Sequence, residues 1–333
     1  MTDDYLWDGR GPRDEEVAAL EGLLRRFGAA DPDPAWRLAR AEGWRTTPGW
    51  LAAVAALVAA CSAVLWIGGR APQPSWPVVR LAGVPMAGAS PVDVAARLAV
   101  GEWLETDAAS RASLAVSTIG RLDVDPGTRL RLVESRDGAH RLALVHGRVH
   151  ALIWAPPGQF VVETPSSRAV DLGCAYTLDV SRDGRGTIEV SAGWVAFEHE
   201  GRESFIPAGA RCETRPGVGP GTPYRIDAPP ALVTALQVID FGSPDPRTRR
   251  DALARVLGAA RAEDAVTLWH LLGTSASEDR DAVFDALARV VPPPVVVTRE
   301  GIRAGDRPMR DAWWNALDLG DAAWWRGWKR RWP

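Results

Sequence analysis

An uncharged apolar run from Trp50 to Ile67 most constrains how this chain of 333 residues can fold. Trp50 and Trp66 stand near the two ends of the run, where indole rings prefer the membrane interface. Its length is near the lower limit for crossing a bilayer core, and Gly49 and Gly68 bring it closer to the usual length of about 20 residues. A buried soluble helix or a signal peptide would also be apolar. However, this run follows a charged segment of 49 residues, which is not typical of a signal peptide. The sequence therefore predicts a single transmembrane helix at 50–67.

Arginine residues around this run predict the orientation of the chain. Arg37, Arg40 and Arg45 lie just before it, whereas Arg70 alone lies close behind it. Because positive charge is retained on the cytoplasmic side, residues 1–49 are expected in the cytoplasm. The Pro-rich linker 68–77 and everything after it are then expected in the periplasm. We therefore predict an inner-membrane protein whose partners include the lipid bilayer.

The cytoplasmic segment 1–49 contains one amphipathic pattern. Pro12 and the acids that follow it are typical of a helix start. An apolar stripe with spacings of three and four then follows: Val17, Leu20, Leu23, Leu24 and Phe27. The segment is too short to bury this stripe by itself. It is either a weakly ordered tail or a helix that binds in the groove of a cytoplasmic partner.

Residues 78–226 change to the period-two pattern of β-strands. Segments such as RLRLVE at 129–134 and YTLDVS at 176–181 alternate apolar and polar residues. Turn signals such as Asp125-Pro126-Gly127 separate these segments at short intervals. The pattern predicts an all-β domain, either a sandwich, a roll or a short solenoid.

Several short segments of this region follow one another in an order that resembles the FecR domain. They are GEWLET at 101–106, LDVDPGT at 122–128, LVHGRV at 144–149, FVVETP at 160–165, VDLGCAYTLDV at 170–180 and IEVSAGWV at 188–195. The chain has Leu172-Gly173-Cys174 where the family usually has Leu-Gly-Thr. The resemblance, over residues ~90–215, implies a periplasmic β-rich domain in an inner-membrane protein. It also implies a relay from an outer-membrane receptor to an extracytoplasmic-function sigma factor.

No pattern of residues indicates catalysis. The chain has no Gly-x-Ser-x-Gly, no phosphate-binding loop and no Gly-x-Gly-x-x-Gly after a strand. His146 and His150 share a face if they lie on one strand, although a hairpin between them fits equally well. They lack carboxylate or cysteine partners at zinc-site spacing. A formal net charge of -3 gives no basic footprint for nucleic acid. We therefore expect no enzyme activity, no cofactor, no metal and no nucleic-acid partner.

One of the three cysteines lies within the predicted membrane helix, and the other two lie on the same side of it. Cys61 lies in the apolar run, where a cysteine behaves as a small packing residue. Cys174 and Cys212 both lie on the oxidising side, where a disulfide between them is compatible with the compartment. The alternative is two buried free thiols.

Helical periodicity returns after the Gly- and Pro-rich stretch 215–230. Four segments carry apolar residues three or four apart: 231–241, 248–261, 262–272 and 279–290. Their pairing resembles a HEAT-type unit, and we predict a small α-helical domain at 230–292.

A Trp-rich tail occupies residues 293–333. Its tryptophans are Trp313, Trp314, Trp324, Trp325, Trp328 and Trp332, and Lys329, Arg330 and Arg331 stand among them. The tail packs on the helical domain, lies on the outer face of the membrane, or stacks on glycan. Membrane or glycan contact would involve Trp324, Trp325, Trp328 and Trp332.

The fold class expected from these features is multidomain. A single transmembrane helix precedes an all-β FecR-like domain, which a small α-helical domain follows. The favoured function is a non-catalytic regulator that couples an outer-membrane or envelope partner to a sigma factor bound by residues 17–27. The alternative is an envelope scaffold whose outer region binds cell-wall glycan or a protein.

Overall fold

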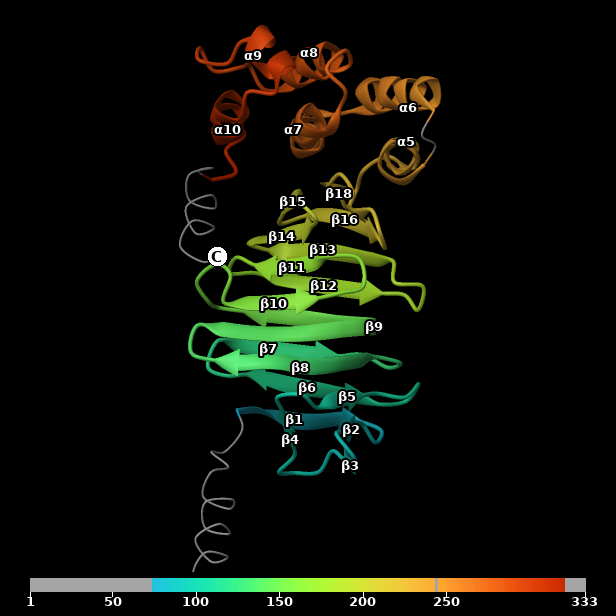
Figure 1. Cartoon of the computed structure of the whole chain (residues 1–333), viewed down its shortest axis with the longest axis vertical. Helices are drawn as coiled ribbons and strands as arrows, with labels where there is room; N and C mark the ends of the chain where they lie inside the picture. Colours follow the sequence, from blue (N-terminus) through green and yellow to red (C-terminus); the bar gives the residue numbers. More distant parts are fainter. Residues whose placement is uncertain (1–73, 243–244, 321–333) are drawn as a thin grey trace, which may run out of the picture. The chain divides into compact units, whose positions relative to one another are not determined.

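The structure, a computed structural model, describes residues 74–242 and 245–320. These residues belong to one compact unit, 72–333, in which a mostly β-sheet region precedes a smaller helical region (Figure 1). Among them, no helix has both the length and the apolar character needed to cross a membrane. The predicted transmembrane helix 50–67, the segment 1–49 and most of the linker 68–77 lie outside the described residues.

The strands form two sheets, and the chain passes from one sheet to the other several times. The first sheet contains β1 (Ser75–Ala82), β6 (Arg111–Val116), β7 (Gly120–Val124), β9 (Ala139–Ile153), β12 (Ala175–Val180), β13 (Gly186–Ala192), β16 (Ala210–Arg215), β17 (Gly219–Pro220) and β18 (Tyr224–Arg225). The second contains β2 (Met86–Ala87), β3 (Ser90–Pro91), β5 (Trp103–Glu105), β8 (Arg129–Arg136), β9, β10 (Phe160–Glu163), β11 (Arg168–Asp171), β14 (Trp194–His199) and β15 (Arg202–Pro207). A short strand, β4 (Arg97–Ala99), pairs with the start of β1. All of these pairs are antiparallel except β9 with β10.

Strand β9 joins the two sheets. Its first half pairs with β8 and β10 in the second sheet, and its second half pairs with β7 and β12 in the first. Gly147 lies where the strand passes from one sheet to the other, with a φ of 104° that favours glycine. A Cβ at this position would collide with the backbone of Thr128. Strand β9 is therefore one bent strand and not a hairpin, so His146 and His150 lie on the same strand.

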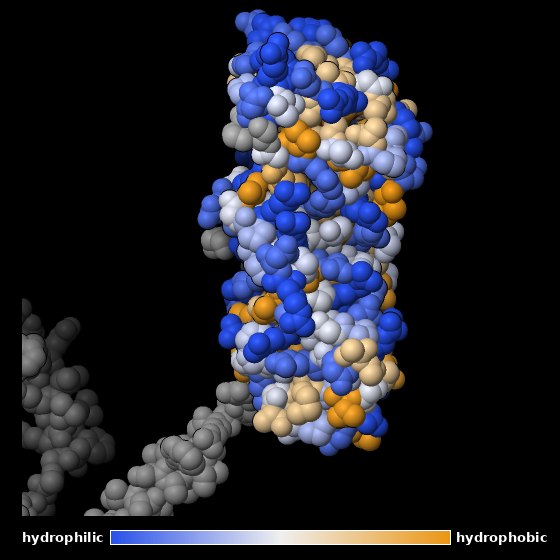
Figure 2. All heavy atoms as spheres, turned by 90° about the vertical axis from the view of Figure 1, so that its right-hand side faces the viewer, coloured by the Kyte–Doolittle hydropathy of each residue, from blue (hydrophilic) through white to orange (hydrophobic). Residues whose placement is uncertain are grey.

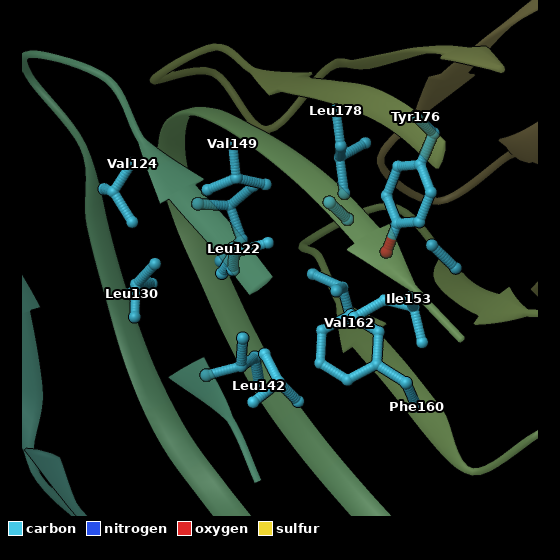
Figure 3. Packing of buried hydrophobic residues seen from close by; sticks show 14 of the residues in the cluster. Leu122, Val124, Leu130, Leu142, Val149, Ile153, Phe160, Val162, Tyr176 and Leu178 are labelled. Carbon is cyan, nitrogen blue, oxygen red and sulfur yellow. The ribbon is translucent and has the colours of Figure 1, made fainter. Parts of the chain in front are cut away.

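The space between the sheets holds the first hydrophobic core. Alternation along each strand supplies it, as in β12, where Tyr176, Leu178 and Val180 are buried and the residues between them are partly exposed. Figure 3 shows Leu122 and Val149 of the first sheet packing towards Leu142 and Phe160 of the second. This core is the physical reason for the period-two pattern in the sequence.

The helical region begins directly after the sheets. It contains α5 (Pro230–Phe241), α6 (Pro246–Ala259), a 3₁₀ turn (Ala262–Asp264), α7 (Ala265–Thr274), α8 (Arg280–Val290), α9 (Arg299–Ala304) and α10 (Arg307–Asn315). Asp245 caps α6 by accepting a hydrogen bond from Thr248 N, and Pro246 occupies the first turn. The first four helices lie close to the residues expected from periodicity. However, helices continue past residue 292 into the tail.

Two tryptophans of the tail are buried in a second hydrophobic core. Trp313 and Trp314 on α10 are both 0% exposed. The Trp313 ring packs against Phe284 at 4.8 Å between ring centroids, and its Nε1 donates to the carbonyl of Val291. Trp313 and Trp314 therefore pack on the helical region. This is the first of the three alternatives given above for the tail. Trp324, Trp325, Trp328 and Trp332 lie outside the described residues.

Candidate interaction site at the junction of the sheets and helices

A histidine joins the helical region to the edge of the second sheet. His270 of α7 accepts a hydrogen bond at Nε2 from the backbone N–H of Phe205 on β15, at 2.9 Å. Its Nδ1 donates to the carbonyl of Val266 one turn earlier, at 2.8 Å. Both contacts require the neutral imidazole, and burial lowers the pKa of His270 to about 4. The histidine therefore acts as a neutral link between helix and strand.

A buried ion pair makes a second link between the two regions. Asp240 of α5 lies 3.1 Å from the guanidinium of Arg202 on β15 and accepts hydrogen bonds from the backbone N–H and the hydroxyl of Thr222. Burial raises the pKa of Asp240, while the contacts with Thr222 and Arg202 lower it. The Asp240 carboxylate thus has a partner for each of its two oxygens, and these contacts fix α5 relative to β15.

A third polar network lies beside these two. The Glu213 carboxylate on β16 accepts a hydrogen bond from the hydroxyl of Tyr224 at 3.0 Å and from Gln237 Nε2 of α5 at 3.1 Å. Thr267 of α7 donates to the carbonyl of Pro223. Helices α5 and α7 are thus fixed to the end of the sheets by side chains from both regions.

Aromatic rings fill the apolar part of the junction. The Trp314 ring of α10 lies 5.7 Å from Phe205, 5.6 Å from Trp194 and 4.7 Å from Trp269. Edge-to-face pairs at such distances contribute about 0.5–1.5 kcal/mol each beyond their buried area. The sheets and the helices therefore share one hydrophobic core at this end.

A cavity of about 370 Å³ opens between β15 and helices α7 and α10. Its walls include Arg202, Glu203, His270, Arg307 and Arg310. The Arg310 guanidinium lies over the Trp269 ring, 5.2 Å from its centroid. The cavity has the mixture of cationic and aromatic groups that suits recognition of a polar partner.

The junction lacks an arrangement for acid–base or nucleophilic chemistry at its histidine. Both ring nitrogens of His270 are engaged with backbone groups, and the lowered pKa keeps the ring neutral. The nearby Ser204 hydroxyl donates to the carbonyl of Gly221 instead of to a base. These side chains hold the two regions together.

A second buried polar cluster lies in the sheets at Asp171, directly before the Leu172-Gly173-Cys174 segment. Its carboxylate accepts hydrogen bonds from the Cys174 thiol at 2.7 Å and from the backbone N–H of Gly173 at 2.7 Å. Burial raises the pKa of Asp171 to about 7. The pKa of the Cys174 thiol is also raised, by burial and by the neighbouring carboxylate, so this thiol is unreactive.

Of the two alternatives for Cys174 and Cys212, the structure has the buried free thiols and not the disulfide. Strand β13 lies between β12 and β16, which places the two cysteines about 10 Å apart across the sheet. Ala175, the neighbour of Cys174, pairs with Ala192, whereas Cys212 pairs with Ile188. The two cysteines are therefore also separated along the strands, by about another 13 Å. A disulfide requires Cα atoms within about 7 Å. The Cys212 thiol donates instead to the carbonyl of Gly221.

The histidines of β9 take part in surface hydrogen bonds. His146 Nδ1 lies 3.0 Å from the carbonyl of Gly127, and His150 lies between Thr177 and Asp125 at 2.9 and 3.1 Å. Over residues 74–242 and 245–320, no group of three His, Cys, Asp or Glu side chains is placed to hold a metal ion.

The predicted partner-binding stripe lies outside the described residues. It comprises Val17, Leu20, Leu23, Leu24 and Phe27. The residues that define the junction, above all His270, Asp240 and Arg202, were not predicted as a site. The sequence places His270 on a helix, but its partner Phe205 is 65 residues away. No spacing rule connects such a pair.

Comparison with known proteins gives a family for the centre of the sheets. Residues 102–196, from β5 to β14, match the family model described as FecR protein. Two crystal structures of a proposed anti-sigma factor from Parabacteroides distasonis are similar to the chain, with 14% identity and a TM-score of 0.34. They cover 40% of this chain, and the chain spans 63% and 62% of their length. No curated protein matches. The chain carries a FecR domain at residues 102–196.

Proposed function

We propose that the chain is a non-catalytic transmembrane regulator of an extracytoplasmic-function sigma factor. The observation that carries this proposal is the FecR domain at residues 102–196, which forms the centre of the two-sheet core. In this proposal residues 50–67 cross the inner membrane, residues 1–49 lie in the cytoplasm, and the sheets and helices lie in the periplasm.

The junction supports this proposal because it fixes the helical region to β15, the strand that follows the FecR domain and pairs with its last strand, β14. His270 bonds to β15, Asp240 pairs with Arg202, and Trp314 packs on Phe205. A partner bound to the helices would therefore act on the sheets as well, since the two regions share one core. In this proposal that partner is an outer-membrane or envelope protein.

On the cytoplasmic side the sigma factor would bind the stripe formed by Val17, Leu20, Leu23, Leu24 and Phe27. An apolar face of this length suits a groove, with three or four anchor residues that become buried on binding. Binding would rest on apolar burial and charge complementarity.

Co-purification tests the proposal. The full-length chain, solubilised in mild detergent, should retain an extracytoplasmic-function sigma factor encoded beside it. The double substitution Leu20→Asp and Leu24→Asp should abolish retention, whereas Glu21→Gln in the same segment should preserve it. If no sigma factor is retained and the chain sediments with isolated cell wall, the envelope scaffold replaces the regulator.

A further inference from the structure

Exposed apolar side chains gather at one end of the unit 72–333. Strands β1, β2, β3 and β4 lie at this end, and the helices lie at the opposite end (Figure 1). Figure 2 shows hydrophobic side chains at the same lower end. The large apolar side chains that are exposed there are Val79, Leu81, Val84, Met86 and Val94. Single exposed apolar residues are ordinary on a protein surface, whereas a group of them marks an interaction surface.

These side chains are open to solvent on every element of this end. Val79 and Leu81 on β1 are 57% and 56% exposed, and Val84 in the following turn is 54% exposed. Met86 on β2 is partly exposed, and Val94 in the loop before β4 is fully exposed. The other large apolar side chains that are exposed in the described ranges lie scattered between residues 145 and 296.

The surface at this end carries almost no charge. Residues 74–94 contain only two charged side chains, Arg80 and Asp93, and their charges cancel. The Asp93 carboxylate already accepts a hydrogen bond from the backbone N–H of Ala95, at 3.0 Å. A contact with this surface would therefore rest on apolar burial and not on charge.

The length of the linker limits what can meet this end. The membrane anchor proposed above ends at Ile67, and β1 begins at Ser75. These eight residue steps span at most about 29 Å, even when fully extended. The lipid headgroups occupy about 5–8 Å of that distance. The remaining space is smaller than a small domain, which is about 30 Å across. The bilayer surface therefore fits here better than a globular protein.

We propose that the β1–β2 end of the unit rests on the outer leaflet of the inner membrane, with its exposed apolar side chains among the lipid headgroups. This inference rests on the membrane anchor at 50–67 in the proposed function. Apolar faces of interfacial proteins lie about 5–10 Å into the headgroup region. Because β1 pairs with β6, which lies within the FecR match, the contact would hold the FecR domain against the membrane.

Quenching by spin-labelled lipid tests this contact in the full-length chain. Val94→Cys in a Cys61→Ala background carries an environment-sensitive fluorophore, since the thiols of Cys174 and Cys212 are buried. The chain is inserted into phosphatidylcholine nanodiscs that contain doxyl-labelled phosphatidylcholine. Fluorescence from position 94 should fall at least about twofold, because the label lies in the interface. The matched control, Val295→Cys, is equally exposed at the helical end and should keep its fluorescence.

Two further comparisons test the apolar nature of the contact. Leu81→Asp with Val84→Asp should reduce the quenching at position 94 at least about twofold, because carboxylates are disfavoured in the interface. Val296→Asp at the helical end should leave it unchanged. Adding phosphatidylglycerol to the nanodiscs should also leave it unchanged, because residues 74–94 have no net charge.

Three results would overturn the proposal. They are the absence of quenching at position 94, equal quenching at positions 94 and 295, and quenching that requires phosphatidylglycerol. A chain that enters the nanodisc without quenching at position 94 contradicts this inference alone. A chain that does not enter the nanodisc contradicts the proposed membrane anchor as well.

Discussion

His270 should make the stability of the unit 72–333 depend on pH in a predictable direction. Its pKa is lowered from 6.5 to about 4 in the folded state, since the ring is buried between Val266 and Phe205. Between these two pH values the unfolded chain binds a proton that the folded chain does not. The free energy of unfolding therefore falls as pH decreases from 6.5 to 4. At about 1.4 kcal/mol per pH unit, the contribution of His270 is about 3 kcal/mol.

The substitution His270→Gln isolates this contribution. A glutamine oxygen can accept the Phe205 N–H bond but does not titrate. Urea unfolding of the fragment 72–333 can be monitored by circular dichroism at several pH values between 4 and 7.5. It gives the free energy of unfolding of the wild type and of His270→Gln at each pH. The wild type should lose about 3 kcal/mol relative to His270→Gln on going from pH 6.5 to pH 4. Two curves that stay parallel over this range would refute the account of His270 as a neutral link.

Three further predictions concern the sheets. Burial raises the pKa of Asp171 from 3.8 to about 7. The free energy of unfolding of the wild type should therefore fall by about 4 kcal/mol, relative to that of Asp171→Asn, as pH rises from 4 to 7. The same urea titration measures this difference, and an opposite slope would contradict the prediction. Gly147→Ala should lower the free energy of unfolding by about 2–4 kcal/mol, since the new Cβ meets the Thr128 backbone. Gly127→Ala, also at positive φ but in open space, should cost only about 1–2 kcal/mol, and equal costs would show that the contact is unimportant. Finally, the thiols of Cys174 and Cys212 in the fragment 72–333 should be titrated without reductant. Both should be unreactive in the folded fragment and both should react after denaturation. A denatured fragment without reactive thiols would indicate a disulfide.

Local periodicity predicted the secondary structure well because it reports which face of each element is buried. The strand pattern in YTLDVS reflects Tyr176, Leu178 and Val180 facing the core. The helix at 231–241 was expected and is observed at Pro230–Phe241. Strand β9 was ambiguous, because a glycine in a strand is compatible with both a bend and a turn.

The candidate site could not be predicted in the same way, because it depends on contacts distant in sequence. Arg202 and Asp240 are 38 residues apart, and each alone resembles an ordinary surface charge. The choice between a disulfide and two free thiols depends on distant contacts in the same way. The predicted compartment would permit a disulfide, but only the strand order shows that β13 separates Cys174 from Cys212.

The central claim is that the N-terminal stripe binds a sigma factor, and the affinity of the full-length chain for that factor tests it most directly. The dissociation constant should be measured in detergent for the wild type, for Leu23→Asp and for Glu21→Gln. Leu23→Asp should weaken binding at least about 30-fold, which corresponds to about 2 kcal/mol, because it places a carboxylate at an apolar contact. Glu21→Gln should change the constant less than about twofold. Equal affinities for the wild type and Leu23→Asp, or no binding by either, would contradict the account.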